Sequence, residues 1–167
     1  MAQTNLQGKT CNTNGAIPTI GSVAPDFVLQ DNQLENQSLN SYQGSAKLIY
    51  TVPSLDTMVC AKTAKALNKL APEYSDIKFI IISTDLPFAQ QRFCKQNNLK
   101  NIITLSMMRS KKFAKEYGVL LVDGPLEGLA ARAVFVLDED NKIVHNELVE
   151  EITKSPDFAL AIDSAAG

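Results

Sequence analysis

Residues 47–70 read KLIYTVPSLDTMVCAKTAKALNKL, and they predict a strand, a short loop and a helix in direct succession. The β-rich run Lys47–Val52 stops at Pro53, because proline cannot donate a hydrogen bond to a sheet ladder. Within Val59–Leu70 the apolar residues recur at spacings of three and four, which is typical of an amphipathic helix. Cys60 is therefore expected in the first turn of this helix.

The same alternation of strands and helices continues along the chain. Strands are expected at 27–29, 77–83, 102–105, 131–137 and 142–148, and helices at 86–97, 109–117 and 156–165. The last two strands are joined by the turn-rich run 138–141, which predicts an antiparallel hairpin. This order predicts an α/β protein with a thioredoxin-like fold, in which helices flank a central mixed β-sheet.

The composition indicates one compact domain over residues 1–167. The chain has 167 residues, of which 45% are hydrophobic, with 16 basic and 18 acidic side chains. A chain of this length buries roughly 70% of its unfolded surface, so it needs neither a metal nor a crosslink to hold a core together. Residues 1–24 are polar and rich in turn residues, and Asn14-Gly15 is a tight-turn dipeptide. We expect an N-terminal extension that forms a β-hairpin.

Charge and hydropathy argue against several classes of protein. A net charge of -2 and the absence of tryptophan give no electrostatic footprint for nucleic acid. The apolar runs are far shorter than the roughly 20 residues of a membrane-spanning helix. The first residues lack the basic flank and apolar stretch of a secretory signal. We therefore expect a cytoplasmic protein, whose thiols are kept reduced.

Cys11, Cys60 and Cys94 form no even disulfide framework, which favours a reactive role for at least one of them. A thiol in the first turn of a helix faces unpaired backbone N–H groups, which stabilise the thiolate. Three residues before Cys60, the Thr57 hydroxyl can interact with that thiolate or with a substrate oxygen, and Pro53 can shield the sulfur from water. A free cysteine is, however, often only a small buried hydrophobe.

Three separate blocks of the sequence resemble one known family. The string PSLDTMVC, residues 53–60, is similar to the active-site signature of peroxiredoxins, in the form that the bacterial thiol peroxidase subgroup shows. STDLPFAQQRFC, residues 83–94, resembles that subgroup's resolving-cysteine helix. DGPLEGLAARAVFVLD, residues 123–138, resembles the strand that carries its active-site arginine. The resemblance covers the chain from about residue 19 to its end and points to the atypical two-cysteine type.

The resemblance implies a role for each matching residue. Cys60 is the expected peroxidatic nucleophile, Cys94 the resolving thiol, and Arg132 the guanidinium beside the nucleophile, with Thr57 and Pro53 as substrate-pocket partners. Such enzymes reduce hydrogen peroxide and organic hydroperoxides, and thioredoxin reduces the disulfide that results. No flavin, haem, metal or other cofactor is implied, and members of this type are commonly homodimers.

The order of the elements bears on how the two thiols meet. A disulfide requires Cα atoms within about 7 Å of each other. Right-handed crossovers on either side of the strand 77–83 could place the helices of Cys60 and Cys94 on opposite faces of the sheet. We therefore expect the two thiols to start too far apart to bond, so that both helix segments must unwind locally.

Two other functions fit the same fold. A general thiol-disulfide oxidoreductase would carry a C-x-x-C pair, but position 57 is threonine. A non-enzymatic, chaperone-like module would keep the fold without the chemistry, since fold alone does not establish activity. The sequence retains all four residues expected at the reactive site, which favours the peroxidase; they are Thr57, Cys60, Cys94 and Arg132.

The remaining candidate groups are assigned no function. The basic cluster of Arg109, Lys111, Lys112 and Lys115 is expected to be a solvated helix face. Cys11 lies outside the matching blocks and is expected to be dispensable. His145 is the only histidine, so neither a zinc site nor a serine hydrolase triad can be assembled. Met58 occupies a position of the signature where smaller residues are frequent, so the width of the pocket or the mobility of the loop can differ.

Overall fold

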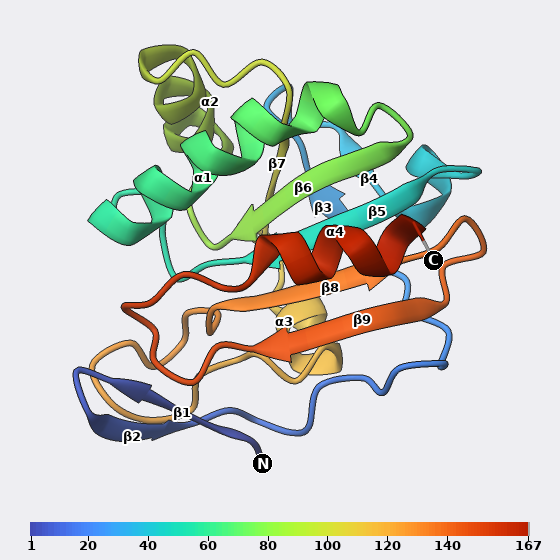
Figure 1. Cartoon of the computed structure of the whole chain (residues 1–167). Coiled ribbons are helices and arrows are strands. Elements are labelled where there is room, and N and C mark those ends of the chain that lie inside the picture. Colours follow the sequence, from blue (N-terminus) through green and yellow to red (C-terminus); the bar gives the residue numbers. More distant parts are fainter. Residues whose placement is uncertain (167) are drawn as a thin grey trace.

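The computed structural model describes residues 1–166 and shows a mixed sheet between helices (Figure 1). The strands are β1 (Gln3–Leu6), β2 (Lys9–Asn12), β3 (Leu29–Gln30), β4 (Asn36–Gln37), β5 (Ala46–Thr51), β6 (Ile77–Ser83), β7 (Ile103–Ser106), β8 (Ala133–Leu137) and β9 (Ile143–Leu148). The helices are α1 (Met58–Leu70), α2 (Pro87–Gln96), α3 (Lys112–Glu116) and α4 (Phe158–Ala166), with short 3-10 turns at Leu39–Tyr42 and Ala71–Glu73. Among residues 1–166, every helix is too short or too polar to pass through a lipid bilayer.

The main sheet has the strand order β4-β3-β7-β6-β5-β8-β9. Strand β6 pairs in parallel with both β5 and β7, whereas β8 pairs antiparallel with β5 and with β9. The sheet is therefore mixed, as the sequence predicts. Strand β6 lies at its centre and is buried except at Lys78, which explains its almost continuous run of β-branched residues.

Helices α1, α2 and α4 cover the same face of the sheet, and α3 lies on the other face (Figure 1). Leu67 of α1, Phe93 of α2 and Ile162 of α4 belong to one hydrophobic cluster, while Phe113 of α3 belongs to a second. The expectation that α1 and α2 flank opposite faces is therefore wrong. The chain steps from β5 to β6 to β7 in one direction across the sheet, and two right-handed crossovers in the same direction leave their helices on the same face.

The N-terminal hairpin is present as β1 and β2, which pair antiparallel. Its turn is formed by Gln7 and Gly8, both with positive φ, and not by Asn14-Gly15 as the sequence suggests. Two positive φ angles match the twist of a two-residue hairpin loop. The hairpin packs against the segment after β9, where the amide of Asn5 donates to the carbonyl oxygen of Glu150 (2.9 Å).

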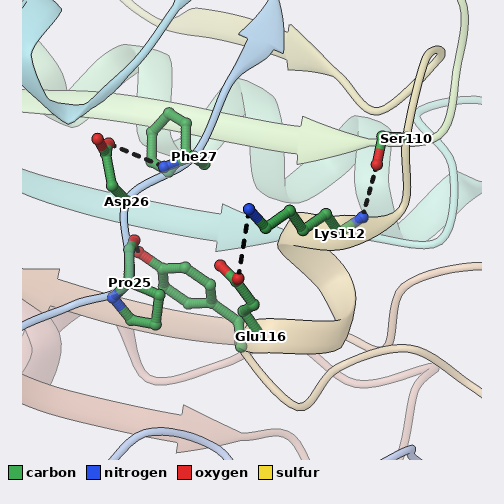
Figure 2. A network of polar contacts seen from close by, with 7 residues as sticks. Pro25, Asp26, Phe27, Ser110, Lys112 and Glu116 are labelled. Carbon is green, nitrogen blue, oxygen red and sulfur yellow. Dashed lines mark hydrogen bonds and ion pairs between the residues drawn. The ribbon is translucent and has the colours of Figure 1, made fainter.

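Helix α3 is shorter than its sequence pattern predicts, and polar contacts fix its surroundings (Figure 2). Lys112 forms an ion pair with Glu116 (3.8 Å), and the hydroxyl of Tyr117 donates to the carbonyl oxygen of Pro25 (2.7 Å). The four side chains of the basic cluster are exposed, as expected for a solvated face. The Tyr117 hydrogen bond thus joins the end of α3 to the segment before β3, whereas the Lys112–Glu116 pair lies within the helix itself.

Candidate active site

The loop between β5 and α1 ends at Thr57, which caps the helix. The side-chain oxygen of Thr57 accepts a hydrogen bond from the backbone N–H of Cys60 (3.4 Å), so the cap fixes where the helix begins. Cys60 is the third residue of α1 and is fully buried. Its thiol thus lies in the first helical turn, where the positive end of the helix dipole stabilises an anion.

Arg132 directly precedes β8 and lies at the end of the sheet where β5 ends and the loop to α1 begins. Ala133 lies opposite Thr51 in the antiparallel pairing of β8 with β5, so Arg132 lies beside the buried Pro53 loop that follows β5. The Arg132 side chain is only 2% exposed. Its Nε donates a hydrogen bond to the carbonyl oxygen of Ile152 (2.7 Å), which fixes the plane of the guanidinium.

A second hydrogen bond connects Arg132 to helix α1 through Tyr50. Nη1 of Arg132 donates to the Tyr50 hydroxyl, which lies 3.0 Å from Oγ1 of Thr63. Thr63 in turn donates to the carbonyl oxygens of Val59 and Cys60 (2.9 and 3.1 Å). A continuous polar chain therefore runs from the guanidinium to the turn of helix that carries the Cys60 thiol.

The charges of the site act on one another. Burial by itself would lower the pKa of the Arg132 guanidinium, but the neighbouring Tyr50 hydroxyl and the Cys60 sulfur raise this pKa above its ordinary value. Burial raises the pKa of Tyr50, and the charge of Arg132 counteracts part of that effect. Arg132 therefore stays a cation and Tyr50 a neutral phenol near pH 7. A positive charge faces the sulfur in a place that excludes water.

Cys94 lies elsewhere on the same face of the sheet. It is the eighth residue of α2, partly buried, and it lines a surface cavity of about 400 Å³ together with Asn32 and Gln91. Burial raises the pKa of the Cys94 thiol, although a hydrogen bond with Thr104 works in the opposite direction. Both Cys94 and Cys60 are free thiols.

The positions of the two cysteines in their helices separate them. Helices α1 and α2 both follow strands of the parallel β5-β6-β7 unit, and Cys94 lies five residues further along its helix than Cys60 does. Helices α1 and α2 are not among the elements that pack closely against each other, and no disulfide joins the two thiols. A disulfide needs Cα atoms within about 7 Å of each other, and the expectation that these two start too far apart stays a prediction.

The structure brings Thr57, Cys60 and Arg132 together next to Pro53, and it keeps Cys94 apart. Sequence reasoning missed Tyr50 and Thr63, because a tyrosine in a buried strand and a threonine in a helix fit a hydrophobic core equally well. Within residues 1–166, no three histidine, cysteine or acidic side chains are grouped so that they could hold a metal ion. The groups that meet at the site are a thiol, a guanidinium and the hydroxyls of Thr57, Tyr50 and Thr63.

This fold and this site define a thiol-based redox protein with a thioredoxin-like fold. The family model described as Redoxin matches residues 19–162. The thiol peroxidase of Leptospira interrogans serogroup Icterohaemorrhagiae serovar copenhageni is 44% identical over 167 residues, which cover 99% of this chain and 98% of the relative. The chain therefore belongs to the Redoxin family and, within it, to the bacterial thiol peroxidases of the peroxiredoxin group. It is a thiol-dependent peroxidase.

Solved structures agree with this assignment. The crystal structure of a peroxiredoxin-like protein from Aquifex aeolicus superimposes with a TM-score of 0.93 at 33% identity, over 99% of this chain and 96% of that one. The thiol peroxidase from Chromobacterium violaceum gives a TM-score of 0.90 at 26% identity, over 96% and 93% of the two chains. These likenesses confirm the predicted thioredoxin-like fold.

Proposed function

We propose that Cys60 is the peroxidatic nucleophile of this peroxidase and that Arg132 and Thr57 are its catalytic partners. The observation that carries this proposal is the burial of the Cys60 thiol in the first turn of α1, against a guanidinium that Tyr50 and Ile152 hold in place. The thiolate is the reactive form of a cysteine, and the N-terminus of α1 and the guanidinium both place positive charge beside this sulfur.

The first step is attack of the Cys60 thiolate on the terminal oxygen of the hydroperoxide. The S–O bond forms as the O–O bond breaks, and the leaving alkoxide or hydroxide takes up a proton, so that Cys60 becomes a sulfenic acid. Arg132 is always charged and can donate hydrogen bonds to the peroxide oxygens as negative charge develops on them. The Thr57 hydroxyl and the Pro53 ring orient the substrate and exclude water.

The second step is resolution by Cys94. Its thiol condenses with the sulfenic acid, so that a Cys60–Cys94 disulfide forms and one water molecule leaves. Cys60 is fully buried in the first turn of α1 and Cys94 lies near the end of α2, so both segments must unwind locally before the sulfurs meet. An external dithiol then reduces the disulfide by exchange, and we assign this role to thioredoxin.

Surface features support further assignments. Met58 is 89% exposed at the start of α1, and an apolar side chain in this place favours organic hydroperoxides beside hydrogen peroxide. Leu86 and Phe88 are exposed at the start of α2, and a second copy of the chain that covered them would form a homodimer. The free thiols fit the reducing conditions of the cytoplasm, where we place the protein.

Mass spectrometry after one equivalent of hydroperoxide tests the roles of the cysteines. The wild-type chain is expected to show a Cys60–Cys94 disulfide with Cys11 still free. Cys60→Ser is expected to consume no peroxide. Cys94→Ser is expected to consume about one equivalent and then to stop in the presence of thioredoxin and its reductase, because only resolution is lost.

Cys11→Ser is the matched control, since Cys11 is also buried, at 2% exposure. It is expected to turn over like the wild-type chain. A Cys60→Ser variant with full activity would reject Cys60 as the nucleophile, and sustained turnover by Cys94→Ser would reassign the resolving role.

A further inference from the structure

The loop that precedes Cys60 is bound by a residue outside the site described so far. Asp85 lies between β6 and α2, and its carboxylate accepts hydrogen bonds from the Ser54 hydroxyl and from the backbone N–H of Leu55, both at 2.8 Å. Strands β5 and β6 are parallel neighbours, so the loops that follow them meet at one edge of the sheet. Asp85 is thus positioned to hold the loop between Pro53 and Thr57.

The same carboxylate is connected to helix α2. The Ser83 hydroxyl donates to Oδ2 of Asp85 (2.7 Å) and accepts from the side-chain amide of Gln90 in α2 (3.1 Å). The amide of Gln90 also donates to the carbonyl oxygen of Leu105 in β7 (2.9 Å). One hydrogen-bonded group therefore connects the loop before the Cys60 helix to the helix that carries Cys94.

Asp85 itself rests on the rigid part of the fold. The Ser106 hydroxyl of β7 donates to the backbone carbonyl oxygen of Asp85, and the backbone N–H of Met107 donates to that of Ser83 (2.9 Å). The central strands β6 and β7 thus fix the backbone on either side of the carboxylate. The hydrogen bonds that Ser54 and Leu55 donate to the carboxylate are not fixed in this way, and they can break when the loop moves.

The network is less well satisfied at α2 than at the loop. Gln90 is fully buried, and its Oε1 finds no hydrogen-bond partner within the described part of the chain. A buried acceptor without a donor is unfavourable, so release of α2 from this arrangement has a lower cost than a fully bonded network would impose. The hydrogen bonds from Ser54 and Leu55 to the Asp85 carboxylate are therefore the ones that restrain the loop before α1.

We propose that Asp85 is a positioning residue that holds the peroxidatic loop in the closed arrangement needed for attack on peroxide, and that its release is part of the opening needed for the Cys60–Cys94 disulfide. Loss of the carboxylate then has two opposite effects. The reaction with peroxide slows, because the loop no longer aligns Thr57 and the first turn of α1. Disulfide formation gains relative to further oxidation of the sulfenic acid, because the open arrangement is reached more readily.

The test compares Asp85→Ala with Asp123→Ala. Asp123 is the control, because its carboxylate likewise joins two distant segments: it accepts from the backbone N–H and the side-chain amide of Asn12 in the N-terminal hairpin. Two quantities are measured for each variant: the rate constant for oxidation by hydroperoxide in a single turnover, and the ratio of disulfide to sulfinic acid by intact mass at excess peroxide.

Asp85→Ala is expected to react at least tenfold more slowly, toward the roughly 100-fold loss that a 1 Å misplacement causes. Its ratio of disulfide to sulfinic acid is expected to rise several-fold, while Asp123→Ala matches the wild-type chain in both. Asp85→Asn is expected to lie between, because its amide oxygen can still accept from Leu55. If Asp85→Ala fails to fold, Ser54→Ala is measured instead, with smaller changes in the same directions.

Because this role rests on the function proposed above, the wild-type chain is measured first. If the wild-type chain forms no Cys60–Cys94 disulfide, the proposed resolving step itself is rejected, whatever Asp85 does. If it does, and Asp85→Ala slows the reaction or lowers stability without changing the product ratio, the carboxylate is only structural and the proposal for Asp85 is overturned.

Discussion

Arg132 donates a hydrogen bond from Nε to the carbonyl oxygen of Ile152, 2.7 Å away, and this bond connects the proposed active site to the N-terminal hairpin. The backbone N–H of Ile152 donates in turn to the carbonyl oxygen of Asn5 in β1 (2.8 Å). The orientation of the guanidinium thus depends on a segment that follows β9 and on a hairpin at the start of the chain.

Arg132→Ala is expected to slow the attack of Cys60 on hydroperoxide. Removal of one preorganised donor from a reacting site costs about 2.7–4 kcal/mol of transition-state stabilisation. The measurement is kcat/KM for a hydroperoxide in a coupled assay with thioredoxin, its reductase and NADPH. Arg109→Ala serves as the control, because Arg109 is an exposed arginine of the basic cluster. Equal rates for the two variants would remove Arg132 from the mechanism.

Tyr50→Phe is expected to lower both stability and the rate of peroxide attack. The change leaves Nη1 of the buried Arg132 without its acceptor, and an unsatisfied buried donor costs about 1–3 kcal/mol. Urea unfolding measures the first effect and single-turnover oxidation the second. Tyr42→Phe is the matched control, since Tyr42 is only partly buried, and it should change neither quantity. A rate unaffected by Tyr50→Phe would mean that Ile152 alone orients the guanidinium.

The sequence is sufficient to place Cys60, because the signals that do so are local. Pro53 ends the strand, Thr57 caps the helix, and the spacing of apolar residues after them defines the helix itself. The predicted strand 77–83 agrees with β6 for the same reason, since its pattern needs no knowledge of distant contacts. Local periodicity and capping thus suffice for the elements that carry Cys60.

The neighbours of Arg132 and the face that α2 covers could not be predicted in the same way. Tyr50 lies 82 residues from Arg132 in the sequence, and no local pattern pairs them. The position of α2 depends on the order of β5, β6 and β7 in the sheet, which the alternation of elements leaves open. Asp85 was part of a matching block, yet its contacts with Ser54 and Leu55 arise only when two loops meet.

Glu151→Gln is expected to weaken the attachment of the N-terminal hairpin in a pH-dependent way. The backbone N–H groups of Thr153 and Gly8 donate to the Glu151 carboxylate and lower its pKa from 4.5 to about 2. A lowered pKa in the folded state stabilises the fold above pH 4.5, and this contribution is lost as the pH falls toward 2. The difference in unfolding free energy between the wild-type chain and Glu151→Gln should therefore be largest at neutral pH.

Urea unfolding at a series of pH values from neutral down to about pH 2.5 measures this difference. Glu150→Gln is the matched control, because Glu150 is the exposed neighbour of Glu151. It should show no such convergence with the wild-type chain. A constant difference between Glu151→Gln and the wild-type chain over the whole range would show that the carboxylate charge does not secure the hairpin.

The Cys94 thiol is expected to stay protonated, and slow to alkylate, at neutral pH in the folded protein. Burial raises its pKa above the ordinary 9.0, so its stabilising contribution is present below pH 9 and is lost as the pH rises through the folded-state pKa. The rate of reaction with iodoacetamide, measured with Cys60 and Cys11 replaced by serine, should therefore rise only in the alkaline range. In the chain unfolded by urea, alkylation should become fast at a lower pH than in the folded protein.

Thr104→Val sharpens this test, because the interaction of Cys94 with the Thr104 side chain is the contact that lowers the pKa of Cys94. Its loss should move the alkylation profile further toward alkaline pH. Thr10→Val is the control, since Thr10 is an exposed threonine of β2 and the same exchange there should leave the profile unchanged. A folded-state profile that coincides with the unfolded one would mean that Cys94 is already open to solvent, and resolution would then require movement of the Cys60 segment alone.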